Sequence, residues 1–219
     1  MSSFVNSHHP FHLTCPTSFS LANGDLQVWD LHSRRPAAVV RKAHSNLGLF
    51  GLMPVGHDSS LLLSHGRDAV LRLWRLAPGT GAGQPVQLLP LLTEPDFGSL
   101  SFCRLGSVAL SSNPRTLAVA TAGASPNCVQ LGLLHFEAEE DVRLVKIGTL
   151  TRPTLPEQHG VVTEAGGMIM SAAFAAPAGA SEGGGMTTLR LFVGYEDGSV
   201  GVWETPVADH GGSSGSSRT

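Results

Sequence analysis

The sequence predicts an all-β protein built as part of a β-propeller, and three observations lead to that prediction. The 26 glycines and 14 prolines divide the 219 residues into short segments. Within these segments apolar residues alternate with a period of two, as in Leu26–Leu31 and Val70–Leu76, which is typical of strands with one buried face. A hairpin-like unit then recurs along the chain, and this repetition favours a propeller over a sandwich or a barrel.

The recurring unit is a strand, a turn that begins with Asn or Asp, and a second strand that ends in Trp. It occurs as Asn23–Trp29, Asp68–Trp74 and Asp197–Trp203, and the residue that begins the turn always stands six positions before the Trp. Asn-Gly and Asp-Gly are strong hairpin signals because these residues tolerate a positive φ angle. Trp29 and Trp74 are 45 residues apart, which matches the ~40–45 residues of a WD-repeat blade.

His44 lies 30 residues before Trp74, at the spacing of the His that accompanies the Trp in WD repeats. Such residues satisfy buried polar atoms and fix turns, so their role is structural. The predicted structural repeat positions are therefore Asn23, Trp29, His44, Asp68, Trp74, Asp197 and Trp203.

The chain divides into about three and a half to four predicted blades. They span residues 18–46, 47–93, 98–150 and 167–206. The third blade has no Trp, and we expect its opening strand at 100–103 and its inner hairpin at 116–121 and 128–131. The fourth is expected to lack its outer strand. Residues 1–17 form a poorly defined N-terminal segment, and residues 207–219 have the Gly- and Ser-rich composition of a flexible tail.

Composition argues against several classes of function. The net charge is −3 and no cluster of Lys and Arg exceeds two neighbours, so we expect no direct binding of nucleic acid. No apolar stretch approaches the ~18 residues of a membrane span, and we expect no membrane association. The three cysteines are widely spaced and odd in number, which suits a reducing, intracellular compartment.

Motifs with the letter pattern of a chemical site lack the context that the chemistry needs. The metal-like residues of the N-terminal segment are His8, His9, His12 and Cys15. They have no second pair of ligands to complete a zinc site. Gly211–Gly215 matches a nucleophile elbow without the strand–turn–helix setting, and Gly79–Gly83 lacks the Lys-Ser/Thr of a phosphate-binding loop. We predict no catalytic, cofactor or metal site, no small-molecule substrate, and hence no enzyme.

Three residues near the predicted turns are candidates for binding a protein partner. Arg67 precedes the turn residue Asp68, and Tyr195 and Glu196 stand in a comparable place before Asp197. Arg and Tyr are enriched among the residues that dominate protein–protein binding energy.

Four further segments in register resemble one particular WD-repeat family. They are Asp30–Arg35, Leu63–Trp74, Ser99–Arg104 and Val193–Val200. In this order they look like the family of the fungal ASTRA-associated protein and its animal G-protein-β-subunit-like counterpart, over roughly residues 18–204. The resemblance implies a seven-bladed propeller that acts as a non-enzymatic scaffold. It also implies a subunit of an ASTRA-like complex, which regulates chromatin and matures PI3K-related kinases, with protein subunits as partners and the nucleus (with the cytoplasm second) as location.

Blade geometry by itself also suits a different adaptor, such as a substrate receptor of a ubiquitin ligase, because a fold does not fix a function. About four blades cannot close a seven-bladed ring, and an open ring leaves a bare sheet edge. We therefore expect a fragment, a truncated gene model, or a half-ring that pairs with another.

Overall fold

The computed structural model describes residues 16–20, 23–30, 32–46, 48–55, 60–77, 86–98, 103–110, 113–137, 141–152, 167–175 and 186–208. These residues form strands and turns without a helix, and the strands make four antiparallel sheets. The all-β prediction is therefore confirmed for the described part of the chain.

Each sheet is one blade, with its strands in sequence order. Blade 1 contains β1 (Pro16–Ser20), β2 (Leu26–Asp30) and β3 (Arg35–Val40). Blade 2 contains β4 (Leu49–Val55), β5 (Leu61–Gly66), β6 (Leu71–Ala77) and β7 (Gln87–Glu94). Blade 3 contains β8 (Gly106–Leu110), β9 (Asn113–Ala122), β10 (Cys128–Phe136) and β11 (Val142–Thr151). Blade 4 contains β12 (Ile169–Phe174), β13 (Met186–Tyr195) and β14 (Val200–Ala208).

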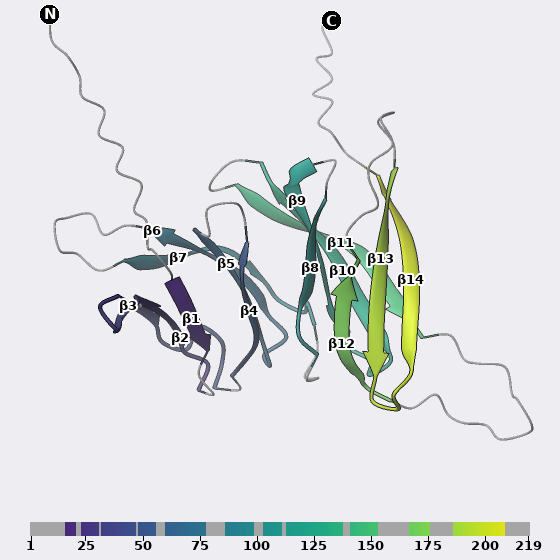
Figure 1. Cartoon of the computed structure of the whole chain (residues 1–219), viewed down its shortest axis with the longest axis horizontal. Helices are drawn as coiled ribbons and strands as arrows, with labels where there is room; N and C mark the ends of the chain where they lie inside the picture. The colour runs from purple at the N-terminus through teal and green to yellow at the C-terminus, as the bar shows by residue number, and fades with distance from the viewer. Residues whose placement is uncertain are drawn as a thin grey trace, which may run out of the picture.

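The blades follow one another side by side (Figure 1). On the inner side, β1 contacts β4, and β8 contacts β12. On the outer side, the last strands of blades 1, 2 and 3 meet, because β7 contacts both β3 and β11. First strands inside and last strands outside are the radial arrangement of a propeller.

The core lies between the blades. Leu62 and Trp74 of blade 2 pack with Leu26 and Val28 of blade 1. The next residue along β5, Leu63, points to the opposite face and packs against blade 3. This is why β5 begins with three consecutive leucines: an inner sheet of the stack is buried on both faces. Burial of each such Leu contributes about 1.5–3 kcal/mol.

The Asn-Gly and Asp-Gly turns have the conformation that their sequence predicts. Gly24 and Gly198 both have a φ angle of +81°, in the left-handed region that favours glycine. A Cβ atom at Gly24 would collide with the carbonyl groups of His44 and Ser45. Gly24 therefore lets the turn of blade 1 approach the loop that precedes β4.

One predicted strand is wrong. Among the described residues, blade 3 opens with β8 at Gly106–Leu110, later than the predicted 100–103, of which residues 100–102 lie outside the described ranges. β8 pairs with β9 through Val108 opposite Ala118. Cys103 precedes β8 without being part of a strand, although it is fully buried in the core between blades 3 and 4. Cys103 is thus an apolar residue that packs into the core outside a strand, and the sequence pattern cannot distinguish such a residue from one in a strand.

Candidate functional site

Four side chains of blade 2 form a continuous chain of hydrogen bonds. Trp74 Nε1 donates to Ser64 Oγ at 2.8 Å. Ser64 Oγ lies 2.8 Å from His44 Nε2, and His44 Nδ1 lies 2.9 Å from Asp68 Oδ1. An indole N–H can only donate and a carboxylate can only accept. We therefore assign the Ser64 hydroxyl as the donor to Nε2, and the Nδ1–H of a neutral His44 as the donor to Asp68.

The four residues come from different elements, so the chain fixes the blade's geometry. Ser64 lies on β5 and Trp74 on β6, whereas Asp68 lies in the turn between them and His44 in the loop before β4. Asp68 also accepts from the backbone N–H of Ser45 at 3.1 Å. The carboxylate therefore ties the hairpin turn of blade 2 to the loop that leaves blade 1.

Burial sets the charge states within this chain. His44 is fully buried, and desolvation lowers its pKa despite the opposing effect of Asp68. Burial acts to raise the pKa of Asp68, but hydrogen bonds from His44, Ser45 and Arg72 outweigh it and hold this pKa below its ordinary value. The negative charge therefore stays on Asp68, with Arg72 at 3.2 Å as its cationic partner.

Ser64, His44 and Asp68 have the connectivity of a catalytic triad but not its accessibility. The Ser64 side chain is fully buried, and its oxygen already accepts the Trp74 N–H. A nucleophilic hydroxyl must reach a substrate carbonyl and face an oxyanion site. This arrangement instead satisfies buried polar groups, which is structural work.

In blade 1, a different set of hydrogen bonds fixes the Trp and the turn. Trp29 Nε1 donates to Gln27 Oε1 at 3.0 Å. Asn23, the predicted turn position, donates to Asp25 at 3.0 Å, and Asp25 accepts from the backbone N–H of Lys42 at 2.8 Å. Asp25, which the sequence reasoning missed, therefore ties this turn to the following loop.

Blade 3 has an apolar residue, Phe97, at the position where blade 2 has His44. The backbone N–H of His44 donates to Gly24 in the turn of blade 1, and Phe97 makes the same bond to Ala69 in the turn of blade 2. Phe97 thus takes the position of the His and is fully buried. Gln130 Oε1 accepts from the Gly98 N–H at 3.0 Å, and Gln130 Nε2 donates to the Asp96 carbonyl at 3.2 Å, which ties the loop to β10.

Blade 4 builds its turn around Asp197. The Ser199 hydroxyl and N–H donate to Asp197 at 2.7 and 3.0 Å, and Arg152 donates at 2.9 Å. These bonds, those of Ser199 first, lower the pKa of Asp197 to about 2. The guanidinium of Arg152 also lies 4.4 Å from the centre of the Tyr195 ring.

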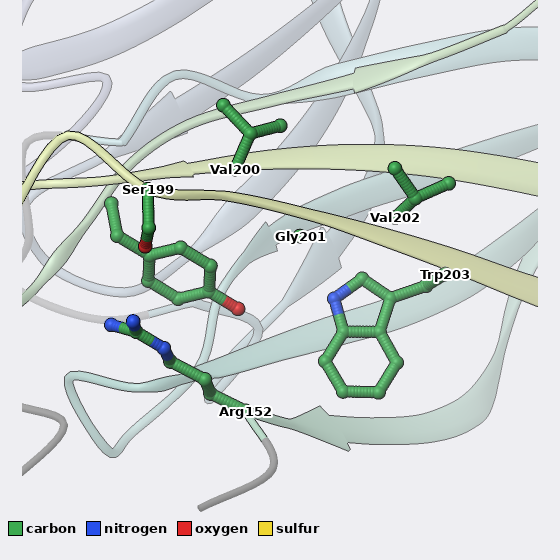
Figure 2. A pocket seen from close by; sticks show the side chains of 7 residues that line it. Arg152, Ser199, Val200, Gly201, Val202 and Trp203 are labelled. Carbon is green, nitrogen blue, oxygen red and sulfur yellow. The ribbon is translucent and has the colours of Figure 1, made fainter. Parts of the chain in front are cut away.

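Trp203 of blade 4 lacks the serine that Trp74 has. In blade 2, Ser64 lies opposite Arg72, which stands two residues before Trp74. In blade 4, the residue two before Trp203 is Gly201, and Val193 lies opposite it in the place of Ser64. The buried Trp203 Nε1 has no hydrogen-bond partner among the described residues. A groove of about 260 Å³ runs beside this indole, with Arg152 across from it (Figure 2).

The three candidate partner-binding residues lie in different environments. Arg67 is half-buried, with its guanidinium 5.2 Å from the centre of the Phe50 ring. Glu196 is exposed, and its backbone N–H donates to the Met168 carbonyl at 2.9 Å. Tyr195 ends β13 and does not lie in the turn; its side chain is 6 % exposed and belongs to the core between blades 3 and 4. Their roles in partner binding stay predictions.

His65 is a further buried residue that the sequence reasoning missed. It follows Ser64 on β5 but points to the opposite face, and neither ring nitrogen has a hydrogen-bond partner among the described residues. Desolvation, together with the nearby His44, lowers its pKa to about 4. His65 therefore packs in the core as a neutral ring.

Within the described ranges, no three His, Cys, Asp or Glu side chains come together as a metal site would require. His8, His9, His12, Cys15, Gly79–Gly83 and Gly211–Gly215 lie outside those ranges. The same ranges contain no helix of the length and apolar character that crossing a membrane requires.

Radially stacked antiparallel blades, with a Trp–Ser–His–Asp chain closing one of them, define this protein as part of a WD-repeat β-propeller. The fold is also that of a solved structure, the β-propeller domain of Myceliophteria thermophila Cps50 (Swd1). The TM-score is 0.50 and the identity 14 %, over 87 % of this chain and 47 % of that one. The predicted fold class, a partial WD-repeat propeller, is confirmed.

Sequence comparison identifies the relatives. No family model matches the chain. It is 28 % identical over 209 residues to ASTRA-associated protein 1 of Verticillium alfalfae, covering 84 % of this chain and 46 % of that protein. It is 28 % identical over 186 residues to guanine nucleotide-binding protein subunit beta-like protein 1 of Mus musculus, covering 83 % and 46 %. The chain thus spans about half the length of these relatives, and the predicted resemblance to the ASTRA-associated WD-repeat proteins is confirmed.

Proposed function

We propose that this chain is a non-enzymatic scaffold whose blades bind protein subunits of an ASTRA-like complex in the nucleus. In this proposal the complex takes part in chromatin remodelling and in maturation of PI3K-related kinases. The observation that carries the proposal is the similarity to ASTRA-associated protein 1 along 84 % of the chain. A ubiquitin-ligase substrate receptor is the alternative, and it rests on the propeller fold without any such relative.

The structure supports a binding role through the loops that the buried framework holds in place. Asp25 and Asp68 each bond a hairpin turn to a neighbouring loop between blades, and Gln130 bonds β10 to another such loop. The turns and loops that are joined in this way lie together at one end of the blades. We call this end the clasped rim and define it by residues 23–25, 41–46, 67–70, 95–98, 123–127 and 196–199. Rigid loops bind with a smaller loss of conformational entropy than mobile ones.

Charges of both signs lie on the clasped rim. Arg41 is 85 % exposed at its side chain, and Lys42, Asp96 and Glu196 are exposed as well. A polar, mixed-charge rim around a less polar centre is the usual composition of a protein–protein interface. Arg67 is half-buried, with its guanidinium over the Phe50 ring, and suits an anchor within such a surface.

Affinity capture from a nuclear extract at physiological salt tests the proposal. The tagged 219-residue chain is expected to retain kinase-related and adaptor subunits, identified by mass spectrometry. A double variant, Arg67→Ala with Glu196→Ala, is expected to lose at least tenfold of this signal. Arg143→Ala is the matched control, because Arg143 is exposed on β11 and pairs with Glu137 away from the clasped rim. Retention of ubiquitin-ligase components in place of the kinase-related subunits would contradict the proposal and favour the alternative.

A further inference from the structure

A groove of about 420 Å³ lies on the outer side of the protein, at the junction of blades 1 and 2. Its two walls are the outermost strands of these blades, β3 and β7, which contact each other (Figure 1). Ala38 and Leu88 are buried at its base, and Val40 and Val86 are partly buried beside them. These four side chains belong to the core between the two blades. The groove is therefore an opening onto the apolar contact between two successive blades.

The small side chains of β3 explain why the groove is open. In blades 1 and 2 a proline lies opposite the Trp, and this proline aligns β3 with β7. The two residues after the proline are Ala37 and Ala38 in β3, whereas they are Leu91 and Leu92 in β7. These leucines pack against the core between blades 2 and 3. Alanine at the same two places of blade 1 leaves the space that forms the groove.

The fourth residue after the proline also differs between the two strands. It is Glu94 in β7, and its carboxylate lies 3.0 Å from Lys146 Nζ, so an ion pair joins the outer strands of blades 2 and 3. The corresponding residue of β3 is Val40, which cannot form an ion pair. The outer strands of blades 1 and 2 therefore lack this polar link, and apolar side chains lie between them.

Exposed cations stand at both ends of the groove. Arg35 precedes the residues of β3 that line it, and Arg41 and Lys42 follow them. Within the described ranges no carboxylate lies at ion-pair distance from Arg35 or Lys42, and Arg41 is 4.0 Å from Asp25, at the limit of an ion pair. The carboxylate of Asp30, which is opposite Arg35 in the sheet, instead accepts hydrogen bonds from the turn that follows it. The groove is thus apolar along its length and positively charged at its ends.

We propose that this groove binds an extended segment of a partner protein, with aliphatic side chains in its middle and carboxylates at both ends. Arg41 stands six positions after Arg35, so at ~3.3 Å per residue a segment of about six residues spans the groove. Pro36 has no N–H and interrupts pairing of a strand with the edge of β3, so side chains carry the recognition. Charges at the border of a contact fix its register and its specificity. The proposal does not rest on the proposed function, because the segment contacts the outer strands and only one of its ends reaches the clasped rim.

Fluorescence anisotropy with labelled synthetic peptides tests the proposal on the full chain. The probe is a peptide of about ten residues, in which alternating leucines and valines stand between two pairs of glutamates. The comparison peptide has lysines in place of the glutamates. The acidic peptide is expected to bind at least about tenfold more tightly than the basic one. Added salt is expected to reduce this difference, because it screens exposed charges.

Variants of the chain locate the binding site. Ala37→Glu places a carboxylate against the apolar groove and is expected to weaken binding of the acidic peptide at least about tenfold. Ala109→Glu is the matched control, because Ala109 is an exposed alanine on β8 of blade 3. Arg35→Gln with Lys42→Gln removes a charge at each end and is expected to reduce the preference for the acidic peptide at least about threefold. Near-ultraviolet circular dichroism checks that every variant keeps the native packing.

The outcomes separate this site from other occupants of the groove. Binding of the acidic peptide that Ala37→Glu weakens and Ala109→Glu does not supports the proposal. Absence of binding, equal affinity for the two peptides, or binding that Ala37→Glu leaves unchanged overturns it. Light scattering adds one further test, since a mass of twice 22.9 kDa that Ala37→Glu halves would assign the groove to a second copy of this chain and overturn the proposal as well.

Discussion

Replacing Ser64 with alanine removes the hydroxyl that joins the Trp74 indole to the His44 imidazole. Both of these partners are buried, and both bonds are 2.8 Å long. The substitution leaves a buried N–H and a buried ring nitrogen without partners, and each such group costs about 1–3 kcal/mol. We therefore expect the free energy of unfolding to fall by about 3 kcal/mol. That is a large part of the ~5–15 kcal/mol that stabilises a typical domain.

Ser107→Ala is the control, because it deletes the same atom from a strand of blade 3. The Ser107 hydroxyl is half-buried and contacts the sulfur of Met53 at 3.0 Å, a weak acceptor, so its loss is expected to cost less than about 1 kcal/mol. Urea unfolding monitored by tryptophan fluorescence gives both values, provided that the slope with denaturant stays unchanged. A cost for Ser64→Ala within about 0.5 kcal/mol of the control would refute the hydrogen-bonded chain.

Two further predictions follow from buried groups and tight turns. The pKa of His65 is lowered to about 4, so the folded state binds fewer protons than the unfolded state; stability is full above the ordinary value of 6.5 and is lost as the pH falls towards 4. Urea unfolding between pH 7 and 4 is expected to show a loss of about 3 kcal/mol that His65→Leu removes, and equal pH profiles would contradict this. Gly24→Ala and Gly198→Ala both place alanine at a φ angle of +81°, but only Gly24 has backbone carbonyls against its Cβ position. Calorimetry is expected to show a cost of ~1–2 kcal/mol at Gly198 and a much larger one at Gly24, and equal costs would be inconsistent with the close approach.

The sequence located the strands best where a turn and a Trp fix their register. β2, β6 and β14 each begin three residues after the Asn or Asp that starts the turn, and they contain Trp29, Trp74 and Trp203 respectively. Blade 3 has no such anchor, and its opening strand was misplaced by several residues. Without a Trp or an Asp-Gly turn, an apolar run in a loop and one in a strand have the same pattern.

The sequence predicts only some of the residues that form the buried framework of the blades. His44 was found from its spacing, but Ser64 was missed because one serine in a leucine-rich strand carries no signal of its own. Its distance of ten residues from Trp74 and four from Asp68 is the signal that would have found it. Phe97, in the position of a His, was hidden because an aromatic residue fills the same space without polar partners.

The central claim is that a buried chain of hydrogen bonds of the WD-repeat type, which runs from Trp74 to Asp68, fixes the geometry of blade 2. Nitrogen-15 NMR of the His44 imidazole tests it most directly, because it reports which ring nitrogen carries the proton. We predict a neutral ring with the proton on Nδ1 at pH 6.5, where a solvent-exposed histidine is half protonated, since burial lowers the pKa of His44. A ring that is half protonated at that pH, or a proton on Nε2, would contradict the assignment of Ser64 as donor and Asp68 as acceptor.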